Sequence, residues 1–285
     1  MEWLNRLNDA LDYLEANLTG EIDLEHTARL AACSQFHFQR MFTYIAGVPL
    51  GEYLRRRRMT LAALMLTSGE AKVIDLALLF GYDSPTAFNR AFQSVHGVPP
   101  SRAREAGVRL TAYPRISFTL SVKGETAMNY RIETMEGFRI VGMKTTLPMD
   151  VEQSFMEVPK IWMQSTPRVP ELLTLATGTP PGLLGVSTCM GGPTFDYYIA
   201  VASGAPVPEG MAECRVPAGT WAIFECVGPM PEAMQTLQKR IVTEWLPTSG
   251  YEYANAPDIE VYFEGDQRAG DYRCEAWLPI VKKAQ

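Results

Sequence analysis

Apolar residues in the first 110 positions recur at helical spacing. Between residues 2 and 18, leucine returns every three or four positions, at Leu4, Leu7, Leu11, Leu14 and Leu18. This spacing predicts an amphipathic helix with one apolar stripe. A second helix is expected from about Leu24 to Ala32, and Ser34 can cap the helix that follows it. The second and third helices, joined by a short turn, predict a helix-turn-helix.

A five-residue motif, Phe-polar-Arg-x-Phe, occurs twice and marks an internal repeat. It reads FQRMF at 38–42 and FNRAF at 88–92, and each copy is followed five positions later by Gly-Val-Pro. The second copy comes after a helix predicted at Val73–Phe80, a turn at Gly81, and an N-cap and first helical position at Ser84 and Pro85. The phenylalanines of each copy lie four residues apart and are expected in a core. The repeat therefore predicts two helix-turn-helix units.

A long helix is predicted between the two units. The segment LGEYLRRRRMTLAALML indicates a helix from about 50 to 67, which would be roughly 27 Å long. Such a rod can hold two recognition helices about one DNA turn apart, roughly 34 Å. Its four consecutive arginines, 55–58, point in directions about 100° apart, so at most two of them can face one phosphate strand.

These segments resemble the DNA-binding domain of AraC/XylS-type bacterial transcription regulators. The resemblance covers residues 1–110 and rests on LAACSQFHFQRMF, YLRRRRMTLAALML and DLALLFGYDSPTAFNRAFQSVHGVPPSRAR. It implies that the recognition helix of each unit contacts bases and phosphates. By motif position, the residues that contact DNA would be Gln35, Phe36, Gln39, Arg40, Thr86, Asn89 and Arg90. Two arginines of the long helix, Arg55 and Arg57, would contact the DNA backbone.

Two features leave room for other interpretations of these residues. Arg40 and Arg90 could be surface arginines that pair with nearby carboxylates. Pro85 stands where relatives carry a glutamine, and proline offers no side-chain hydrogen bond, so base readout by the second unit is expected to be weaker.

Strand-like and helical patterns alternate in the rest of the chain. Residues 111–127 are expected to form a linker, with an extended stretch at Ile116–Val122. Residues 128–285 show a β-α-β-β order twice, with each of YRIETMEGFRIVGMKTT and ECRVPAGTWAIFECVG predicted as one strand and the first helix interrupted near Pro159. The predicted fold class is an all-α double helix-turn-helix domain followed by an α+β domain. Two small antiparallel sheets would lie side by side, with helices on one face and a concave groove on the other.

The second domain resembles the GyrI-like effector-binding domain, mainly in DIEVYFEGDQRAGDYRCEAWLPIVKK and VPAGTWAIFECVG. Strand alternation in CEAWLPI separates Glu275 and Trp277 from Cys274, Ala276 and Leu278. If the second set packs on the helices, Glu275 and Trp277 face the groove and suit a lipophilic cation. The resemblance implies a glutamate at this position that holds cationic ligands. The other interpretation is a solvent-exposed glutamate on an edge strand.

Three further aromatic residues are candidates for the walls of the groove or, with equal weight, for the core: Tyr197, Tyr198 and Trp221.

The charge of the chain is concentrated in its second part. Residues 1–110 hold 12 Lys+Arg and 12 Asp+Glu, so 14 and 20 remain for residues 111–285, and the net charge of -6 belongs to them. An acidic domain is a poor partner for nucleic acid and a good one for cations. No apolar run is long enough to span a membrane, and the N-terminus lacks a basic segment followed by an apolar one, so a bacterial cytoplasmic protein is expected.

Neither a catalytic nor a metal site is predicted. The five cysteines show no C-x-x-C spacing, and all three histidines lie in the first domain without ligand-spaced partners. No cofactor is expected.

The patterns and resemblances together predict a sequence-specific DNA-binding transcription regulator with a small lipophilic or cationic effector. Its partners would be double-stranded DNA, the effector and RNA polymerase, with no membrane. Two alternatives stay open, because the resemblance also implies that GyrI-like domains can hydrolyse small electrophiles with a pocket glutamate and tyrosine, or bind a protein such as gyrase.

Overall fold

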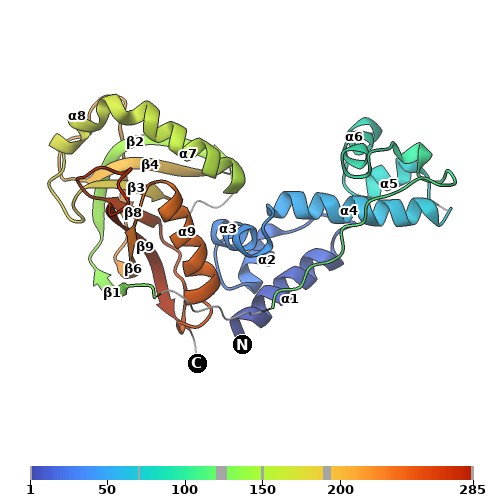
Figure 1. Cartoon of the computed structure of the whole chain (residues 1–285), viewed down its shortest axis with the longest axis horizontal. Helices are drawn as coiled ribbons and strands as arrows, with labels where there is room; N and C mark the ends of the chain where they lie inside the picture. Colours follow the sequence, from blue (N-terminus) through green and yellow to red (C-terminus); the bar gives the residue numbers. More distant parts are fainter. Residues whose placement is uncertain (1, 70, 120–126, 149–150, 189–193, 284–285) are drawn as a thin grey trace. The chain divides into compact units, whose positions relative to one another are not determined.

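The chain forms two compact units. The computed structural model describes residues 2–69, 71–119, 127–148, 151–188 and 194–283 (Figure 1). The first unit comprises the described parts of 1–31 and 46–119, and the second those of 32–45 and 120–285. The helix that carries the first FQRMF motif therefore packs with the C-terminal unit. Residues 120–126 of the expected linker, and Cys189, lie outside the described residues.

The helices of the first unit form where the sequence predicts them. They are α1 (Glu2–Ala16), α2 (Leu24–Leu30), α4 (Leu50–Thr67), α5 (Val73–Leu79) and α6 (Pro85–His96), followed by a 3₁₀ turn at Pro100–Arg102. The Asp23 side chain caps α2 by accepting from the His26 backbone N at 2.8 Å. The Ser84 hydroxyl caps α6 by accepting from the Ala87 backbone N at 3.2 Å. Gly97, in the left-handed conformation, ends α6.

The second copy of the phenylalanine motif lies in a core, as predicted. Phe88 and Phe92 of α6 are fully buried and pack with residues of α4 and α5. The main contributors from those two helices are Met59, Ala62, Leu66, Leu76 and Ala77.

The described part of the expected linker is held against the first unit. Residues 108–119 form no strand, and Phe118 is tied to α1 by two hydrogen bonds. Asn8 Nδ2 donates to the Phe118 carbonyl at 3.1 Å, and the Phe118 N–H donates to Asn8 Oδ1 at 3.0 Å. Across the described ranges, no helix is long and apolar enough to cross a membrane.

The second unit is α+β, as predicted. It contains α3 (Gln35–Ala46), α7 (Val151–Ser165), α8 (Val169–Thr174) and α9 (Glu232–Arg240), which continues as a π-helical turn at Ile241–Trp245. Pro159 lies inside α7 and does not end it, unlike the predicted interruption. The strands are β1 (Tyr130–Met135), β2 (Phe138–Pro148), β3 (Leu183–Ser187), β4 (Thr194–Ala202), β5 (Ala212–Val216), β6 (Gly219–Val227), β7 (Tyr251–Tyr253), β8 (Asp258–Tyr262) and β9 (Arg273–Lys282).

The strand pairing corrects two predictions. The segments predicted as single strands at the start of each repeat are two strands each, broken at residues 136–137 and 217–218. Each repeat is therefore β-β-α-β-β, and the second has the additional short strand β7 after its helix. The two expected sheets are one, in the order β1-β6-β9-β8-β3-β4-β2-β5, with β7 on β9. The order is symmetric about its centre, because β1, β2, β3 and β4 of the first repeat take the same places as β5, β6, β8 and β9 of the second. The two halves of the sheet meet where β3 pairs with β8, with Gly185 opposite Glu260.

Both faces of the sheet carry a core. One face buries Leu184, Val186, Tyr198, Trp221, Val261 and Trp277. The other buries Leu147, Phe195, Tyr197, Ile199 and Val201 against α8 and the inner side of α7, and Phe36 of α3 belongs to this second cluster. Because neighbouring strand residues point to opposite faces, Tyr197 and Tyr198 are separated.

Candidate functional site

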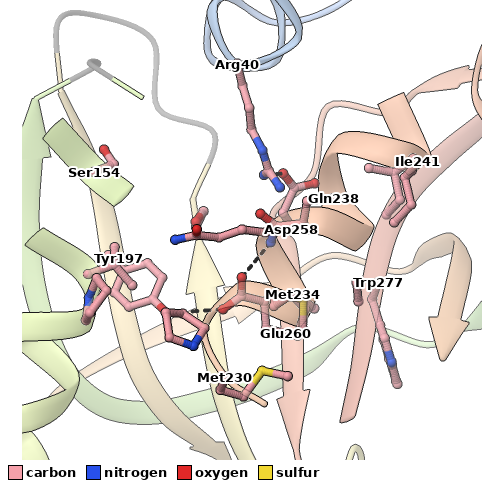
Figure 2. A pocket seen from close by; sticks show the side chains of 18 of the residues that line it. Arg40, Ser154, Tyr197, Met230, Met234, Gln238, Ile241, Asp258, Glu260 and Trp277 are labelled. Carbon is pink, nitrogen blue, oxygen red and sulfur yellow. Dashed lines mark hydrogen bonds and ion pairs between the residues drawn. The ribbon is translucent and has the colours of Figure 1, made fainter. Parts of the chain in front are cut away.

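A cavity of about 370 Å³ lies in the C-terminal unit, within the range of roughly 300–1,000 Å³ common for small-molecule pockets. It is enclosed by α3, α7, α9 and the strands β4, β8 and β9 (Figure 2). The groove was predicted on the face opposite the helices, whereas the cavity lies on the helix face. It is lined there by Ala276 and Leu278, the strand residues that were expected to pack on helices.

Most side chains around the cavity are apolar or aromatic. The rings come from α3, α7, β4, β7 and β8, and the aliphatic and thioether groups come mainly from α7 and α9. These residues include Phe36, Phe195, Trp162, Tyr197, Tyr253, Tyr262, Val158, Met163, Met234, Ile241 and Val242. Such a surface favours a ligand with aromatic or other apolar groups, because burial of apolar area drives its binding.

Three charged residues contribute to the described lining: Arg40, Asp258 and Glu260. Glu260 of β8 accepts hydrogen bonds from Gln238 Nε2 at 2.6 Å, Tyr262 Oη at 2.9 Å and Tyr197 Oη at 3.3 Å. Among the described residues, no cation lies within ion-pair distance of it. Burial raises the pKa of the Glu260 carboxyl, and the three hydrogen bonds and Arg40 only partly oppose that rise.

A glycine on the neighbouring strand permits this arrangement. Gly185 of β3 lies opposite Glu260 in the register, and a Cβ atom there would lie 2.5 Å from Tyr197 Oη and 2.7 Å from Glu260 Oε2. Tyr197 is fixed from its other side, because Trp162 Nε1 donates to its hydroxyl at 2.9 Å. Only a residue without a side chain leaves room for the tyrosine hydroxyl and the carboxylate at this point.

The end of the cavity next to α3 is closed by an ion pair. Arg40 reaches from α3 and donates to Asp258 Oδ2, as Figure 2 shows. His37 Nε2 lies 3.3 Å from the other oxygen of the same carboxylate, and its ring stacks on Tyr253 with centroids 3.9 Å apart. Burial alone would raise the pKa of Asp258, but His37 and Arg40 outweigh it and hold that pKa below its ordinary value.

A line of hydrogen bonds joins the two carboxylates. Arg40 Nε donates to Tyr44 Oη at 3.1 Å, Tyr44 Oη donates to Gln238 Oε1 at 3.1 Å, and Gln238 Nε2 donates to Glu260. Arg40 also donates to Asp258, so one uninterrupted path runs from Glu260 to Asp258 through α3. We call this path the α3 relay.

The predicted ligand-binding residues divide between the two faces of the sheet. Tyr197 lines the cavity, whereas Tyr198 and Trp221 lie in the core of the other face. Trp277 belongs to that same core and borders the cavity from its place on β9. Glu275 does not line the cavity. Its carboxylate accepts from Arg131 at 2.7 Å and 3.2 Å and from Trp277 Nε1 at 2.8 Å. The side chains of β9 alternate between the two faces of the sheet as expected, but the cavity lies on the face of Ala276 and Leu278 and not on that of Glu275.

Sequence reasoning did not single out Asp258, Glu260 or Tyr262. The signal was present, because period-2 alternation in DIEVYFEG separates these three polar residues from Ile259 and Val261. Two acidic residues on one face of a strand whose other face is apolar indicate a carboxylate-lined cavity or a solvent-exposed face.

The two helices predicted to read DNA have different surroundings. On α6, the side chains of Thr86, Asn89 and Arg90 are exposed. On α3, Gln35 and Gln39 are half-buried, while Phe36 and Arg40 retain only 6% and 9% of their surface. Phe36 packs against Phe195 with ring centroids 4.9 Å apart. Arg40 thus has the carboxylate partner that was the second interpretation of its role.

The two arginines predicted to touch the DNA backbone are engaged within the first unit. Arg57 donates to Glu15 at 2.7 Å and to the Tyr113 carbonyl at 2.7 Å, and its side chain is 11% exposed. Arg55 donates to Glu52 at 2.7 Å and to Ser94 Oγ at 2.7 Å, but remains more exposed.

Comparison with known proteins places both parts of the chain. The sequence pattern of the GyrI-like small molecule binding domain matches residues 128–281, and that of a helix-turn-helix domain matches residues 27–106. The right origin-binding protein of Escherichia coli (strain K12) is 25% identical over 300 residues, covering 98% of this chain and 99% of that protein. The HTH-type transcriptional activator AarP of Providencia stuartii is 39% identical over 98 residues, covering 34% of this chain and 73% of that protein.

A solved structure shares the fold of the C-terminal domain. SAV2435, bound to tetraphenylphosphonium, superposes with a TM-score of 0.50 at 21% identity, covering 54% of this chain and 94% of that one. The GyrI-like match alone spans more than half of the 285 residues, and the relatives that share the helix-turn-helix domain are named as transcription regulators. The chain therefore belongs to the AraC/XylS-type DNA-binding transcription regulators that carry a C-terminal GyrI-like small molecule binding domain.

Proposed function

We propose that the effector of this regulator is an organic cation with aromatic or other bulky apolar groups, held in the cavity by Glu260. The observation that carries the proposal is that Glu260 is the charged group of the described lining left without a counter-ion. Arg40 and Asp258 neutralise each other, so the lining has one net negative charge. The aromatic rings around that charge favour a lipophilic cation over a hydrated one.

The expected strength of this interaction is large enough to decide selectivity. A cation about 5 Å from a carboxylate, at an effective dielectric constant of about 20, gains about 3 kcal/mol. Apolar contact adds to binding whether the ligand is charged or not. Charge at Glu260 should therefore separate cations from neutral molecules of the same outline. The tetraphenylphosphonium bound by SAV2435, which has the same domain fold, is a ligand of the proposed class.

Calorimetric titration of the full chain tests the proposal. Tetraphenylphosphonium is the cationic probe, and triphenylphosphine oxide is a neutral compound with similar rings. Glu260→Gln keeps the shape of the side chain, and we expect it to weaken the cation by about 1 to 3 kcal/mol with little effect on the neutral compound. Glu275→Gln is the matched control, because this carboxylate pairs with Arg131 away from the cavity. Equal loss for both probes in Glu260→Gln would rule out a role for its charge.

The DNA contacts are also proposals. Thr86, Asn89 and Arg90 on exposed α6, and Gln35, Phe36, Gln39 and Arg40 on α3, are the residues that we assign to base and phosphate contact, in keeping with the helix-turn-helix match. Such a regulator acts on the bacterial chromosome in the cytoplasm, with RNA polymerase as its further partner. The segment 1–110 is proposed as the DNA-binding domain.

Hydrolysis of a small electrophile is the second candidate for the cavity. Two tyrosine hydroxyls lie within 3.3 Å of Glu260, and the raised pKa of this carboxyl suits a general base. A hydrolysis assay on the same variants, beside the binding titrations, decides between the candidates. Turnover of an electrophilic ester that is lost in Glu260→Gln and kept in Glu275→Gln would support catalysis, and no turnover with intact cation binding would support sensing alone.

A further inference from the structure

The helix α3 takes part in two functions. Its motif assigns it to DNA reading, and its side chains wall the effector cavity of the C-terminal unit. Resting on the function proposed above, we infer that Asp258 competes with DNA for Arg40, and that a cation bound at Glu260 releases Arg40 through the α3 relay. The cavity and the first reading helix would then form one regulatory device.

The internal repeat provides a comparison for α3. Phe36, Gln39 and Arg40 correspond to Thr86, Asn89 and Arg90 at a spacing of 50 residues. The second set is exposed on α6, and Arg90 forms no ion pair with the described residues, whereas Arg40 is buried against Asp258. These motif residues are thus exposed in the second copy, whereas in the first copy Phe36 and Arg40 are buried in contacts with other residues. The residues contacted include Asp258 of the effector-binding domain.

Arg40 cannot serve Asp258 and DNA together. A guanidinium that contacts a guanine or a phosphate must direct its N–H groups at that acceptor, but here Arg40 directs them at Asp258 and Tyr44. Phe36 is equally engaged, because its ring packs on Phe195. Contact of α3 with DNA therefore requires these contacts to break.

A cation in the cavity opposes the docked position of Arg40. Arg40 contributes to the electrostatic environment of Glu260, and a hydrogen-bonded path of two residues, Tyr44 and Gln238, joins them. A ligand cation placed at Glu260 adds a second positive charge to the same enclosed space, and like charges repel strongly there. The repulsion is relieved when Arg40 leaves. A cation should therefore raise DNA affinity, and a neutral ligand of similar shape should not.

Fluorescence anisotropy with the full chain tests this inference. The DNA probe is a duplex selected from a random pool by the wild-type protein, and the ligand probes are tetraphenylphosphonium and triphenylphosphine oxide. Saturating cation should tighten wild-type binding at least about fivefold, within the usual range of coupling between two sites, and the neutral compound should leave it unchanged. By reciprocity, the DNA should tighten cation binding by the same factor.

Asp258→Asn removes the competing charge. Without ligand, this variant should bind the duplex at least about fivefold more tightly than the wild type, and the cation should add little. Asp196→Asn is the matched control, because Asp196 is a buried carboxylate of the same sheet that pairs with Lys144 and lies outside the cavity lining. It should respond to the cation as the wild type does.

Tyr44→Phe interrupts the α3 relay without a change of charge. The effect of the cation on DNA affinity should fall from the wild-type factor toward one. This variant and the comparison of cation with neutral compound on the wild type decide the matter even if Asp258→Asn fails to fold, which circular dichroism would show.

The possible results distinguish failure of the proposed function from failure of the competition for Arg40. If the wild type selects no DNA or binds no cation, the proposed function fails. If it binds both, but the cation leaves DNA affinity unchanged, or Asp258→Asn binds DNA as the wild type does, the function stands and the competition for Arg40 is refuted.

Discussion

Arg40 and Asp258 are 218 residues apart in the sequence and form an ion pair whose side chains are only 11% and 10% exposed. The pair joins the motif that a helix-turn-helix uses for DNA to a strand of the effector-binding domain. Removing one partner of such a pair leaves a buried charge without compensation, which is strongly unfavourable. The pair therefore selects one position of α3 within the C-terminal unit.

Glu260→Gln should stabilise the fold at neutral pH. Burial raises the pKa of this carboxyl above its unfolded value, so the folded state binds its proton more tightly. The stability that this proton confers is present below the unfolded pKa and is lost as pH rises through the folded pKa. We expect the variant to unfold at a higher temperature than the wild type at pH 7, with the difference vanishing toward pH 4. Thermal denaturation followed by circular dichroism from pH 4 to 8 measures it.

A buried charge kept for ligand binding at the expense of stability is a known feature of functional sites. Glu275→Gln controls for the loss of a carboxylate as such, and it should not raise the unfolding temperature because it breaks the pair with Arg131. A wild type more stable than Glu260→Gln by the same margin at every pH would contradict the argument.

Gly185→Ala should displace the Tyr197 and Glu260 side chains that line the cavity. The new Cβ would lie 2.5 Å from Tyr197 Oη, and the tyrosine cannot yield easily because Trp162 fixes it. We expect a loss of stability of about 1 to 3 kcal/mol and at least a several-fold loss of tetraphenylphosphonium affinity by calorimetry. Gly204→Ala is the control, since its Cβ would have its nearest contact at 3.8 Å. If both variants bind the cation alike, the close approach at Gly185 is unimportant.

Local signals predicted the helices well. The long helix has the predicted limits because an apolar stripe and a lack of interior glycine and proline after Gly51 define it. Ser84 caps α6 and Gly81 has a φ of +73°, as the turn residues indicate. These features depend on a few neighbouring residues, so one sequence suffices to find them.

Long-range pairing explains most of what the sequence did not predict. The segment 130–148 has strand character over most of its length. Two signals indicate a break: this length, beyond the usual 3 to 10 residues, and Gly137 within the segment. Which face of β9 meets the cavity depends on where α7 and α9 pack, and no local pattern specifies that. The partner of Arg40 is a strand residue 218 positions later in the sequence, and no local pattern specifies such a pair.

Arg90→Ala should weaken binding to the selected duplex by about 1 to 3 kcal/mol. Arg90 is exposed and lies where the motif places a DNA contact. Because Arg90, unlike Arg40, forms no ion pair with the described residues, its effect should be the same with and without tetraphenylphosphonium. Anisotropy titrations with the selected duplex measure it, and Arg102→Ala, which removes an exposed arginine outside the recognition helix, is the control. Unchanged affinity in Arg90→Ala would make α6 a scaffold, an outcome that Pro85 already suggests.

Arg57→Ala should lower stability more than it lowers DNA affinity. The guanidinium donates to Glu15 and to the Tyr113 carbonyl, and the side chains of the pair are only 11% and 10% exposed. Burial tends to raise the pKa of Glu15, but the hydrogen bonds from Arg57 and Tyr53 outweigh it and lower that pKa. Truncation at 57 would leave this carboxylate uncompensated, so we expect a loss of about 3 kcal/mol in urea denaturation. Arg102→Ala breaks an exposed pair with Glu105 and should cost less than about 1 kcal/mol.

The dependence of DNA affinity on salt distinguishes a structural role of Arg57 from a role in DNA contact. A phosphate contact at Arg57 would reduce the slope by about one when the residue is removed, whereas a residue that anchors α4 to α1 would leave it unchanged. We expect the unchanged slope, and a reduced slope with intact stability would return Arg57 to the DNA interface.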